Sequence, residues 1–337
     1  KYNTTMLIIS HDFEVIEYLT EKVLILLRGN LIEKGRTEKI LEEPKHPYTF
    51  ALLQSSTFLN PWKDLWGIRE EEDEKYPCPF YKRCTQKVEA CLTYIPYLKS
   101  DIEEGVACYK NGIEKLLVLK NIRKLFKTSE QKVEAVRDCS LRVRQGEIVA
   151  LLGKSGSGKT TLLKTINGIN PISSGDILLN DKSTKEYTEK ELARDISFMN
   201  QNTNIEFDFP CIDIVVLGRY PYLERFQEYS KKDIELAEKY MELTDTLKLR
   251  DKSILQLSGG ERQRVLFAKI LTQESQVILL DEPTASLDMR HEEDLLKEVS
   301  KERAKDKIVI LVIHNLRTAI KYCSRLILLS NGNIVKD

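Results

Sequence analysis

Short, unbroken apolar runs recur along the chain, and three of them end at a residue with chemical function. Residues 148–153 (Ile-Val-Ala-Leu-Leu-Gly) open a glycine-rich stretch, and residues 277–280 (Val-Ile-Leu-Leu) lead into Asp281 and Glu282. A third run reaches His314. Apolar runs of this length are typical of strands buried on both faces of a parallel sheet. The pattern therefore predicts an α/β fold whose strands carry polar groups to one edge of the sheet.

The hydrophobic pattern of residues 6–34 returns at residues 309–337, with an offset of 303. In both copies an apolar run reaches a histidine, a helical pattern follows, and a second apolar run ends in Gly-Asn. The offset aligns His11 with His314. A repeated strand–helix–strand unit indicates a duplicated α/β domain. We therefore predict three segments: the tail of a first copy (1–45), a linker with a cysteine-rich extension (46–115) and most of a second copy (116–337).

The composition is that of a folded protein without a strong electrostatic field of either sign. Hydrophobic residues make up 42% of the chain, and 52 basic residues balance 52 acidic ones. No basic surface is indicated, so we expect no nucleic-acid partner. No apolar run approaches the roughly 18–20 residues of a membrane-spanning helix. The chain begins without an initiator Met or a signal sequence, and we expect a cytoplasmic protein or a fragment of one.

The glycine-rich stretch at 153–160 matches the phosphate-loop motif G-x-x-x-x-G-K-[ST], between a predicted strand and a predicted helix. Its backbone N–H groups can surround a polyphosphate, aided by the positive end of the helix. Lys159 can reach the β and γ phosphates, and Thr160 can coordinate Mg²⁺. The predicted nucleotide-binding residues of this stretch are Gly153, Lys154, Ser155, Gly156, Ser157, Gly158, Lys159, Thr160 and Thr161.

Two further motifs accompany the phosphate loop. Asp281 and Glu282 follow a predicted buried strand, where Asp281 can hold a metal ion or its water and Glu282 can polarise an attacking water. Residues 257–261 (Leu-Ser-Gly-Gly-Glu) stand just before a predicted helix. Such a run can be a helix cap, or it can be a second anion-binding helix terminus.

From about residue 116 to 337 the chain resembles an ATP-binding-cassette (ABC) ATPase. The motifs that carry the resemblance occur in the family's order: the phosphate loop, Gln201, residues 257–261, Asp281-Glu282, Ser286-Leu-Asp288 and His314. The resemblance implies a P-loop NTPase fold of the ABC type with a helical subdomain. It also implies an ATPase that binds ATP with Mg and hydrolyses it.

The resemblance assigns a role to each of these residues. Glu282, His314 and Gln201 would be catalytic, and Thr160, Gln201 and Asp281 would hold Mg. Phe126 would stack on the adenine. Ser258, Gly259 and Gly260 would contact a nucleotide held by the phosphate loop of another domain. That partner would be a second ABC domain in a tandem chain, or an identical chain in a head-to-tail dimer, and His11 would belong to the site of the first copy.

Four cysteines fall at C-x5-C-x6-C-x16-C spacing, namely Cys78, Cys84, Cys91 and Cys108. Four thiols can enclose one soft metal centre, but the spacing is wider than that of a zinc ribbon. An iron–sulfur cluster, a zinc ion and a metal-free module all remain open on this reasoning. Residues 43–53 and the cysteine segment resemble the extension of oligopeptide, dipeptide and nickel import ATPases, and this resemblance favours a [4Fe-4S] cluster.

Residues 216–221 (Val-Leu-Gly-Arg-Tyr-Pro) resemble the iron-siderophore, haem and cobalamin importers. We therefore expect the ATPase subunit of an importer of peptides or of a metal or metal chelate. It would lie at the inner face of the cell membrane, with transmembrane permease subunits as partners. The alternative is a soluble tandem ABC ATPase that remodels a ribosome, DNA or an enzyme complex. The acidic run at 69–75 and the place of the cysteines after the first copy favour transport.

Overall fold

The computed structural model describes most of the 337 residues, and the chain divides into two compact units, Lys1–Glu114 and Lys115–Asp337. The predicted acidic run at 69–75 and Ser286 lie outside the described residues. The structure describes all residues except residues 1–5, 43, 56–75, 82–83, 85–86, 95, 97, 99–102, 110–111, 113–114, 128–131, 202–204, 286 and 304–306.

The first unit is built on a small antiparallel sheet in the order β1-β2-β3. One face of its hairpin packs on Phe80 and on Ile40, and these side chains form the core together with Ile25, Leu27 and Ile32. Its elements are α1 (Phe13–Leu19), β1 (Lys22–Leu27), β2 (Asn30–Arg36), α2 (Thr37–Glu42), α3 (Pro47–Ser55), a 3-10 turn (Glu89–Leu92) and β3 (Gly105–Val106).

The second unit contains a six-stranded sheet in the order β13-β12-β6-β11-β10-β9, whose strands are parallel except β13. The apolar runs predicted as buried strands are β6 and β10, and their side chains are almost completely buried. The strands are β6 (Ile148–Leu152), β9 (Ile196–Met199), β10 (Val277–Asp281), β11 (Ile308–Val312), β12 (Arg325–Ser330) and β13 (Asn333–Lys336).

A second, antiparallel sheet in the order β5-β4-β7-β8 shares a core with the first sheet and with helix α4 (Lys159–Ile166). Leu162, Leu163 and Ile166 of α4 are fully buried in that core. The helix that follows the phosphate loop is therefore fixed by apolar packing to both sheets. These strands are β4 (Lys115–Lys127), β5 (Lys132–Arg144), β7 (Ser174–Leu179) and β8 (Lys182–Ser183).

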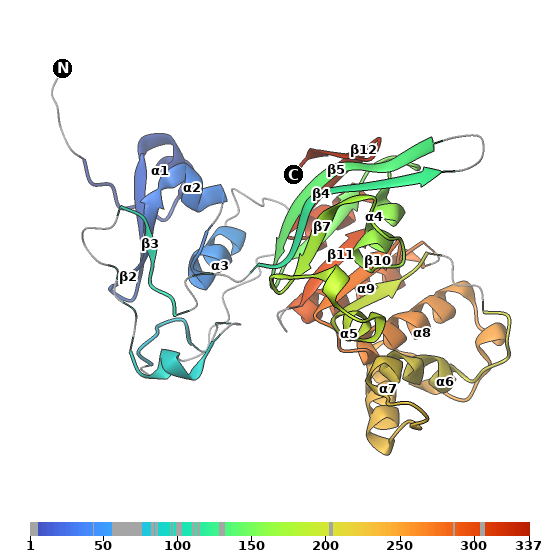
Figure 1. Ribbon diagram of the computed structural model, residues 1–337. Coiled ribbons are helices and arrows are strands. Elements are labelled where there is room, and N and C mark those ends of the chain that lie inside the picture. Colours follow the sequence, from blue (N-terminus) through green and yellow to red (C-terminus); the bar gives the residue numbers. More distant parts are fainter. Residues whose placement is uncertain are drawn as a thin grey trace. The chain divides into compact units, whose positions relative to one another are not determined.

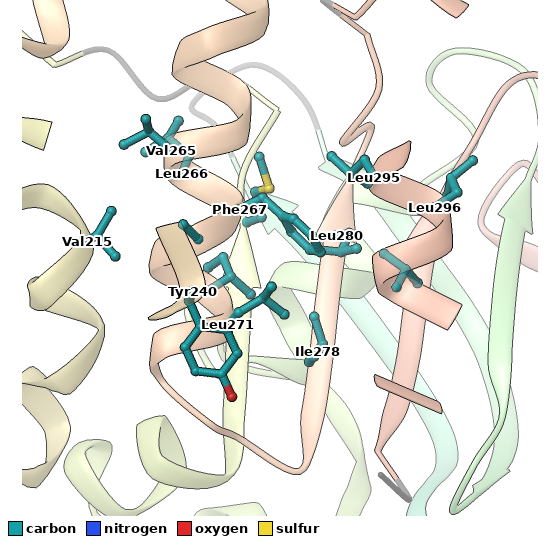
Figure 2. Close-up of a cluster of buried hydrophobic side chains, with 14 of the residues drawn as sticks. Val215, Tyr240, Val265, Leu266, Phe267, Leu271, Ile278, Leu280, Leu295 and Leu296 are labelled. Carbon is teal, nitrogen blue, oxygen red and sulfur yellow. The ribbon is translucent and has the colours of Figure 1, made fainter. Parts of the chain in front are cut away.

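The remaining helices pack on the central sheet or extend from it, and α6, α7 and α8 gather in one group (Figure 1). Figure 2 shows Phe267 and Leu271 of α8 beside Ile278 and Leu280 of β10. This contact fixes α8, the helix that follows the Leu-Ser-Gly-Gly-Glu signature at residues 257–261, to the strand that ends in the two carboxylates. The helices are α5 (Glu189–Asp195), α6 (Cys211–Val216), α7 (Lys231–Leu243), α8 (Gly259–Thr272), α9 (Met289–Arg303) and α10 (Leu316–Tyr322).

Short 3-10 turns complete the second unit: Thr184–Glu186, Leu217–Tyr222, Leu247–Leu249 and Ile254–Gln256. Among the described residues, none of the helices combines the length and the apolar character that a membrane span requires. The predicted α/β fold with a helical subdomain is thus present in the second unit.

Candidate nucleotide-binding site

The phosphate loop connects the end of β6 to the start of α4, in the strand–loop–helix context that the motif requires. Gly153 and Gly158 adopt φ of +148° and +102°, which side chains other than glycine rarely adopt. A Cβ on Gly153 would lie 2.3 Å from the carbonyl oxygen of Leu329. These positions therefore need glycine both for conformation and for the close approach of β12.

The ammonium group of Lys159 bends back onto the loop. Its Nζ donates to the carbonyl oxygens of Gly153 (2.9 Å) and Lys154 (3.0 Å). Burial lowers the pKa of Lys159, and the nearby carboxylates of Glu282 and Asp281 act in the opposite direction. The loop thus holds a cation among carbonyl oxygens at the place where the β and γ phosphates of a nucleotide would lie.

Asp281 is fully buried at the carboxyl end of β10. Its Oδ1 accepts a hydrogen bond from Thr160 Oγ1 (3.1 Å), whereas its Oδ2 has no hydrogen-bond partner among the described residues. Burial raises the pKa of this carboxyl, and the Thr160 hydrogen bond only partly opposes the effect. A buried carboxylate oxygen without a partner, next to a threonine hydroxyl and a phosphate loop, fits a hydrated Mg²⁺.

Glu282 contacts both of its predicted catalytic neighbours. Its Oε2 accepts from Gln201 Nε2 (2.6 Å), and its Oε1 lies 2.6 Å from His314 Nε2. The backbone of Glu282 has φ +51°, an uncommon conformation for a residue other than glycine. The turn after β10 therefore aims the carboxylate at two side chains that follow β9 and β11, the strands on either side of β10.

A cavity of about 510 Å³ lies over the phosphate loop. Most of the predicted nucleotide-binding residues line it, and Lys159, Gln201 and Glu282 do so from three different elements. The structure does not bring Phe126 into this lining, although its cross-strand partner Val133 is there. Six further lining residues were not predicted from the sequence: Val133, Glu134, Ala135, Arg137, Asn331 and Gly332.

The turn between β12 and β13 supports the phosphate loop from one side. Gly332 N–H donates to the carbonyl oxygen of Ser157 (3.0 Å), and Gly332 in turn accepts from Arg137 N–H (2.7 Å). A Cβ on Gly332 would lie 2.9 Å from the carbonyl oxygen of Ala135. The glycine that recurs at the same place in both copies of the repeat, Gly29 and Gly332, was the sequence signal that could have identified this contact.

The signature residues stand apart from this cavity. Ser258 is the N-cap of α8 and forms a capping box with Glu261, while Gly259 and Gly260 begin the helix. None of these residues lines the cavity over the phosphate loop of the same unit. Ser258 remains exposed, so the N-terminal end of α8 is accessible to a group outside this unit.

The helical group holds a second cavity, of about 430 Å³. Phe207, Phe209 and Leu217 are exposed large apolar side chains in its lining, which also includes the carboxylates of Glu206 and Asp213. An exposed apolar surface with a few charged groups is typical of a protein–protein contact.

The four clustered cysteines, Cys78, Cys84, Cys91 and Cys108, line one cavity of about 20 Å³ together with His46. Burial raises the pKa of the Cys78 thiol, and the nearby thiols of Cys91 and Cys108 raise this pKa as well. Within the described part of the chain, no group of three or more His, Cys, Asp or Glu side chains is arranged to hold a metal ion. The predicted iron–sulfur cluster is therefore not shown by the geometry, although the four thiols do share one cavity.

Two family models match the chain. The model described as ABC transporter matches residues 136–285. The model described as oligopeptide/dipeptide transporter, C-terminal region, matches residues 32–91, which include the first three of the clustered cysteines.

Curated relatives share about a third of the matched residues. The ferric enterobactin transport ATP-binding protein FepC of Escherichia coli is 37% identical over 205 residues, 60% of this chain and 76% of that protein. The hemin import ATP-binding protein HmuV of Thermobifida fusca is 34% identical over 197 residues, 58% of this chain and 69% of that protein. A solved dimeric ATP-binding cassette, in a post-hydrolysis state with ADP and Pi, is 27% identical with a TM-score of 0.60. The match covers 66% of this chain and 97% of that one.

The fold and the site together define a P-loop nucleotide-binding ATPase. More specifically, the chain belongs to the family of ABC transporter ATP-binding proteins. The predicted ABC family, fold class and ATPase activity are thereby confirmed.

We predict that Asp281→Asn stabilises the nucleotide-free chain. Folding raises the pKa of this carboxyl, because its charged form is disfavoured in the folded state. The folded protein therefore loses stability as the pH rises through the pKa of the folded state. At pH 7 the variant should unfold at higher urea, with a gain on the order of 1 kcal/mol. The gain should disappear below about pH 4, where the carboxyl is protonated in both states. Asp208→Asn, at an exposed site, is the control, and a destabilised Asp281→Asn at pH 7 would contradict the argument.

We also predict that Gly332→Ala weakens ATP binding by at least tenfold. The added Cβ would clash with the carbonyl oxygen of Ala135 and would disturb the contact between Gly332 and the phosphate loop. Gly29→Ala is a matched control, because Gly29 has nearly the same φ (+77° against +79°) but nothing within 4 Å of the added carbon. Calorimetric titration with ATP measures both variants. Equal ATP affinities for the two would show that the turn does not support the loop.

Proposed function

We propose that the chain is the ATP-binding and ATP-hydrolysing subunit of an importer. It would act on the inner face of the cell membrane with transmembrane permease subunits. Iron–siderophore or haem-type metal chelates are the substrate class best supported, because the relatives described above are named for ferric enterobactin and hemin. Peptide import has only the match at residues 32–91 in its favour. The same relatives favour transport over a soluble remodelling ATPase.

ATP would lie in the cavity over the phosphate loop. The loop N–H groups and Lys159 would bind the phosphates, and Thr160 and Asp281 would hold Mg²⁺, which supplies charge neutralisation at the phosphates. Val133 and its cross-strand partner Phe126 offer an apolar surface for the adenine at the end of the β4–β5 hairpin. The cavity and its exposed loop residues support this placement.

The contact among Gln201, Glu282 and His314 is the observation that carries the proposal. Glu282 is placed to accept a proton from an attacking water beside the phosphate loop. Gln201 and His314 each bond one of its oxygens, so they fix the orientation of the carboxylate and can hold the water. Gln201 also precedes the segment that leads to α6, so its contact with Glu282 links the helical group to the reacting centre.

We propose that the signature residues complete a site on another cassette. Ser258, Gly259 and Gly260 lie at a helix N-terminus outside their own unit's cavity, and the solved relative with ADP and Pi is dimeric. The partner would be an identical chain in a head-to-tail dimer or a first cassette in the same polypeptide. In the second case residues 1–45 are the end of that first cassette, 46–115 its extension and 116–337 the second cassette.

The cavity lined by Phe207, Phe209 and Leu217 is proposed to receive the permease. Its apolar side chains would bury against a helix of the partner, and Asp213 and Glu206 favour a basic residue there. Nucleotide-driven movement of α6 and α8 would then pass to the membrane subunit, and the permease would bias the ATPase in return.

The four clustered thiols are proposed to bind a soft metal centre, with a [4Fe-4S] cluster as first candidate. Their common cavity and the donor set support this. A cavity of about 20 Å³ holds little more than one water molecule, so the thiols would have to move apart to admit a cluster.

Substitutions of Lys159 and Glu282 should affect different steps, ATP binding in the first case and ATP hydrolysis in the second. Lys159→Ala should weaken ATP binding about 10- to 100-fold, because charge-assisted bonds to the phosphates are lost. Glu282→Gln should keep ATP affinity but lower the hydrolysis rate by about 10²- to 10⁴-fold. Calorimetry and phosphate release measure the two effects, with the exposed Glu228→Gln as control. Normal turnover by Glu282→Gln would exclude it as the base.

We predict from the proposed permease contact that Leu217→Asp abolishes co-purification of the chain with its membrane partner and leaves its ATP affinity unchanged. Leu217 lines the apolar cavity, whereas the similarly exposed Leu243 does not and serves as control in Leu243→Asp. Membrane pull-down followed by mass spectrometry is the measurement. Retention of the partner by Leu217→Asp would refute the proposed contact, and a ribosomal, DNA-bound or enzyme partner would favour the remodelling ATPase.

Protein purified without oxygen should carry iron and sulfide in equal amounts, and Cys91→Ser should lose both. Cys211→Ser is the control, since that thiol is buried in the second unit. Because the Cys78 thiol is protonated at neutral pH, metal uptake should release protons and strengthen as the pH rises. Elemental analysis that finds zinc, or no metal, would exclude the cluster.

A further inference from the structure

Strand β5 carries a pair of charged side chains into the cavity over the phosphate loop. Glu134 and Arg137 both line that cavity, and neither belongs to the phosphate loop or to the motifs that follow it in the sequence. Arg137 Nε lies 3.6 Å from Glu134 Oε2, and the two side chains are 50% and 36% exposed. Among the described residues that line the cavity, Arg137 and Lys159 are the cationic side chains. The site therefore offers a second cation to its ligand.

The pair owes its position to a β-bulge. The register of the β4–β5 ladder shifts between Lys124 and Leu125, and Ala135 is thereby an extra residue in β5. In a regular strand, two residues three positions apart point to opposite faces. The bulge shifts the alternation by one residue, and it brings Glu134 and Arg137 within ion-pair distance of each other.

The bulged residue is also the point at which β5 approaches the phosphate loop. A Cβ on Gly158 would lie 2.3 Å from the carbonyl oxygen of Ala135. The backbone N–H of Arg137 donates to the carbonyl oxygen of Gly332 (2.7 Å), and the N–H of Gly332 donates to that of Ser157 in the loop (3.0 Å). The backbone of Arg137 is thus tied to the loop through a single residue, whereas its side chain is half exposed.

Glu134 holds Arg137 only weakly. A distance of 3.6 Å between Nε and Oε2 is longer than a normal hydrogen bond, and ion pairs between exposed side chains contribute little to stability. A phosphate group, by contrast, can accept two parallel hydrogen bonds from one guanidinium group. The guanidinium group of Arg137 can therefore exchange the carboxylate for a phosphate at small cost.

The charge of a bound nucleotide favours this exchange. A triphosphate carries more negative charge than Lys159 and one Mg²⁺ neutralise. The carboxylates of Glu282 and Glu134 add further negative charge to the lining of the cavity. Arg137 supplies the additional positive charge at the wall that β5 forms.

We propose that Arg137 binds the phosphate chain of ATP, and that Glu134 is the partner that it leaves when the nucleotide enters. Glu134 thereby opposes binding, because its carboxylate competes for the guanidinium group and repels the phosphates. The inference rests on the proposed nucleotide site, and it adds a phosphate ligand from β5 to the ligands that the loop provides.

Two substitutions in the 337-residue chain should change ATP affinity in opposite directions. Arg137→Gln should weaken ATP binding about 10-fold, because charge-assisted hydrogen bonds to the phosphates are lost. Glu134→Gln should strengthen it about two- to fivefold, because the competing carboxylate is removed. The control is Arg142→Gln, at an exposed arginine of the same strand that does not line the cavity. Calorimetric titration measures all three, and an affinity of Arg137→Gln equal to that of the control, or a loss of affinity in Glu134→Gln, would overturn the proposal.

Inorganic tripolyphosphate with Mg²⁺ is the probe that separates a phosphate contact from a nucleoside contact. Arg137→Gln should weaken its binding by the same factor as that of ATP, because the contact requires neither base nor ribose. A loss of ATP affinity with unchanged tripolyphosphate affinity would place Arg137 at the nucleoside and overturn the proposal. Lys159→Ala should weaken the binding of both ligands whatever the role of Arg137. If both affinities stay unchanged in Lys159→Ala, the proposed nucleotide site itself is wrong.

Discussion

A buried carboxylate that lacks half of its hydrogen bonds is the constraint on which the nucleotide site depends. All five residues of β10 are buried, and Asp281 at its end has one oxygen bonded to Thr160 and one without a partner in the described structure. An unsatisfied buried polar atom costs about 1–3 kcal/mol and a charged one costs more, and a cation with its waters would remove that cost. The parallel sheet keeps Asp281 in place because β9 and β11 pair with β10 on both sides.

The same strand end connects three parts of the second unit. The turn after Asp281 has positive φ at Glu282, whose carboxylate then meets Gln201 after β9 and His314 after β11. Phe267 and Leu271 fix the signature helix α8 to the back of β10. The helical group thus contacts β10 through α8, and Gln201 contacts Glu282 from the end of β9. We propose that Glu282 activates the attacking water and that a partner's movement would affect hydrolysis through these same contacts.

The local sequence was enough to predict those parts of the site whose functional residues are contiguous in the chain. The strand–loop–helix around Lys159 and the strand before Asp281 appear where the apolar runs placed them, since buried strands and glycine-rich loops have strong local signals. The supporting turn at Gly332 and the wall at Val133 were missed because they depend on contacts between residues far apart in the chain. Phe126 was predicted from the resemblance to the ABC family, and it lies outside the cavity lining, although its directly paired cross-strand neighbour Val133 belongs to that lining.

The central claim is that Asp281 and Thr160 hold a divalent cation against the phosphates of ATP. Electron–nuclear double resonance with Mn²⁺ in place of Mg²⁺ tests it most directly, in the Glu282→Gln background so that ATP is not consumed. We expect phosphorus couplings from ATP that appear only when Mn²⁺ and ATP are both present, and that are lost in Asp281→Ala. Phosphorus couplings of equal strength in Asp281→Ala, or Mn²⁺ bound without contact to the phosphates, would contradict it.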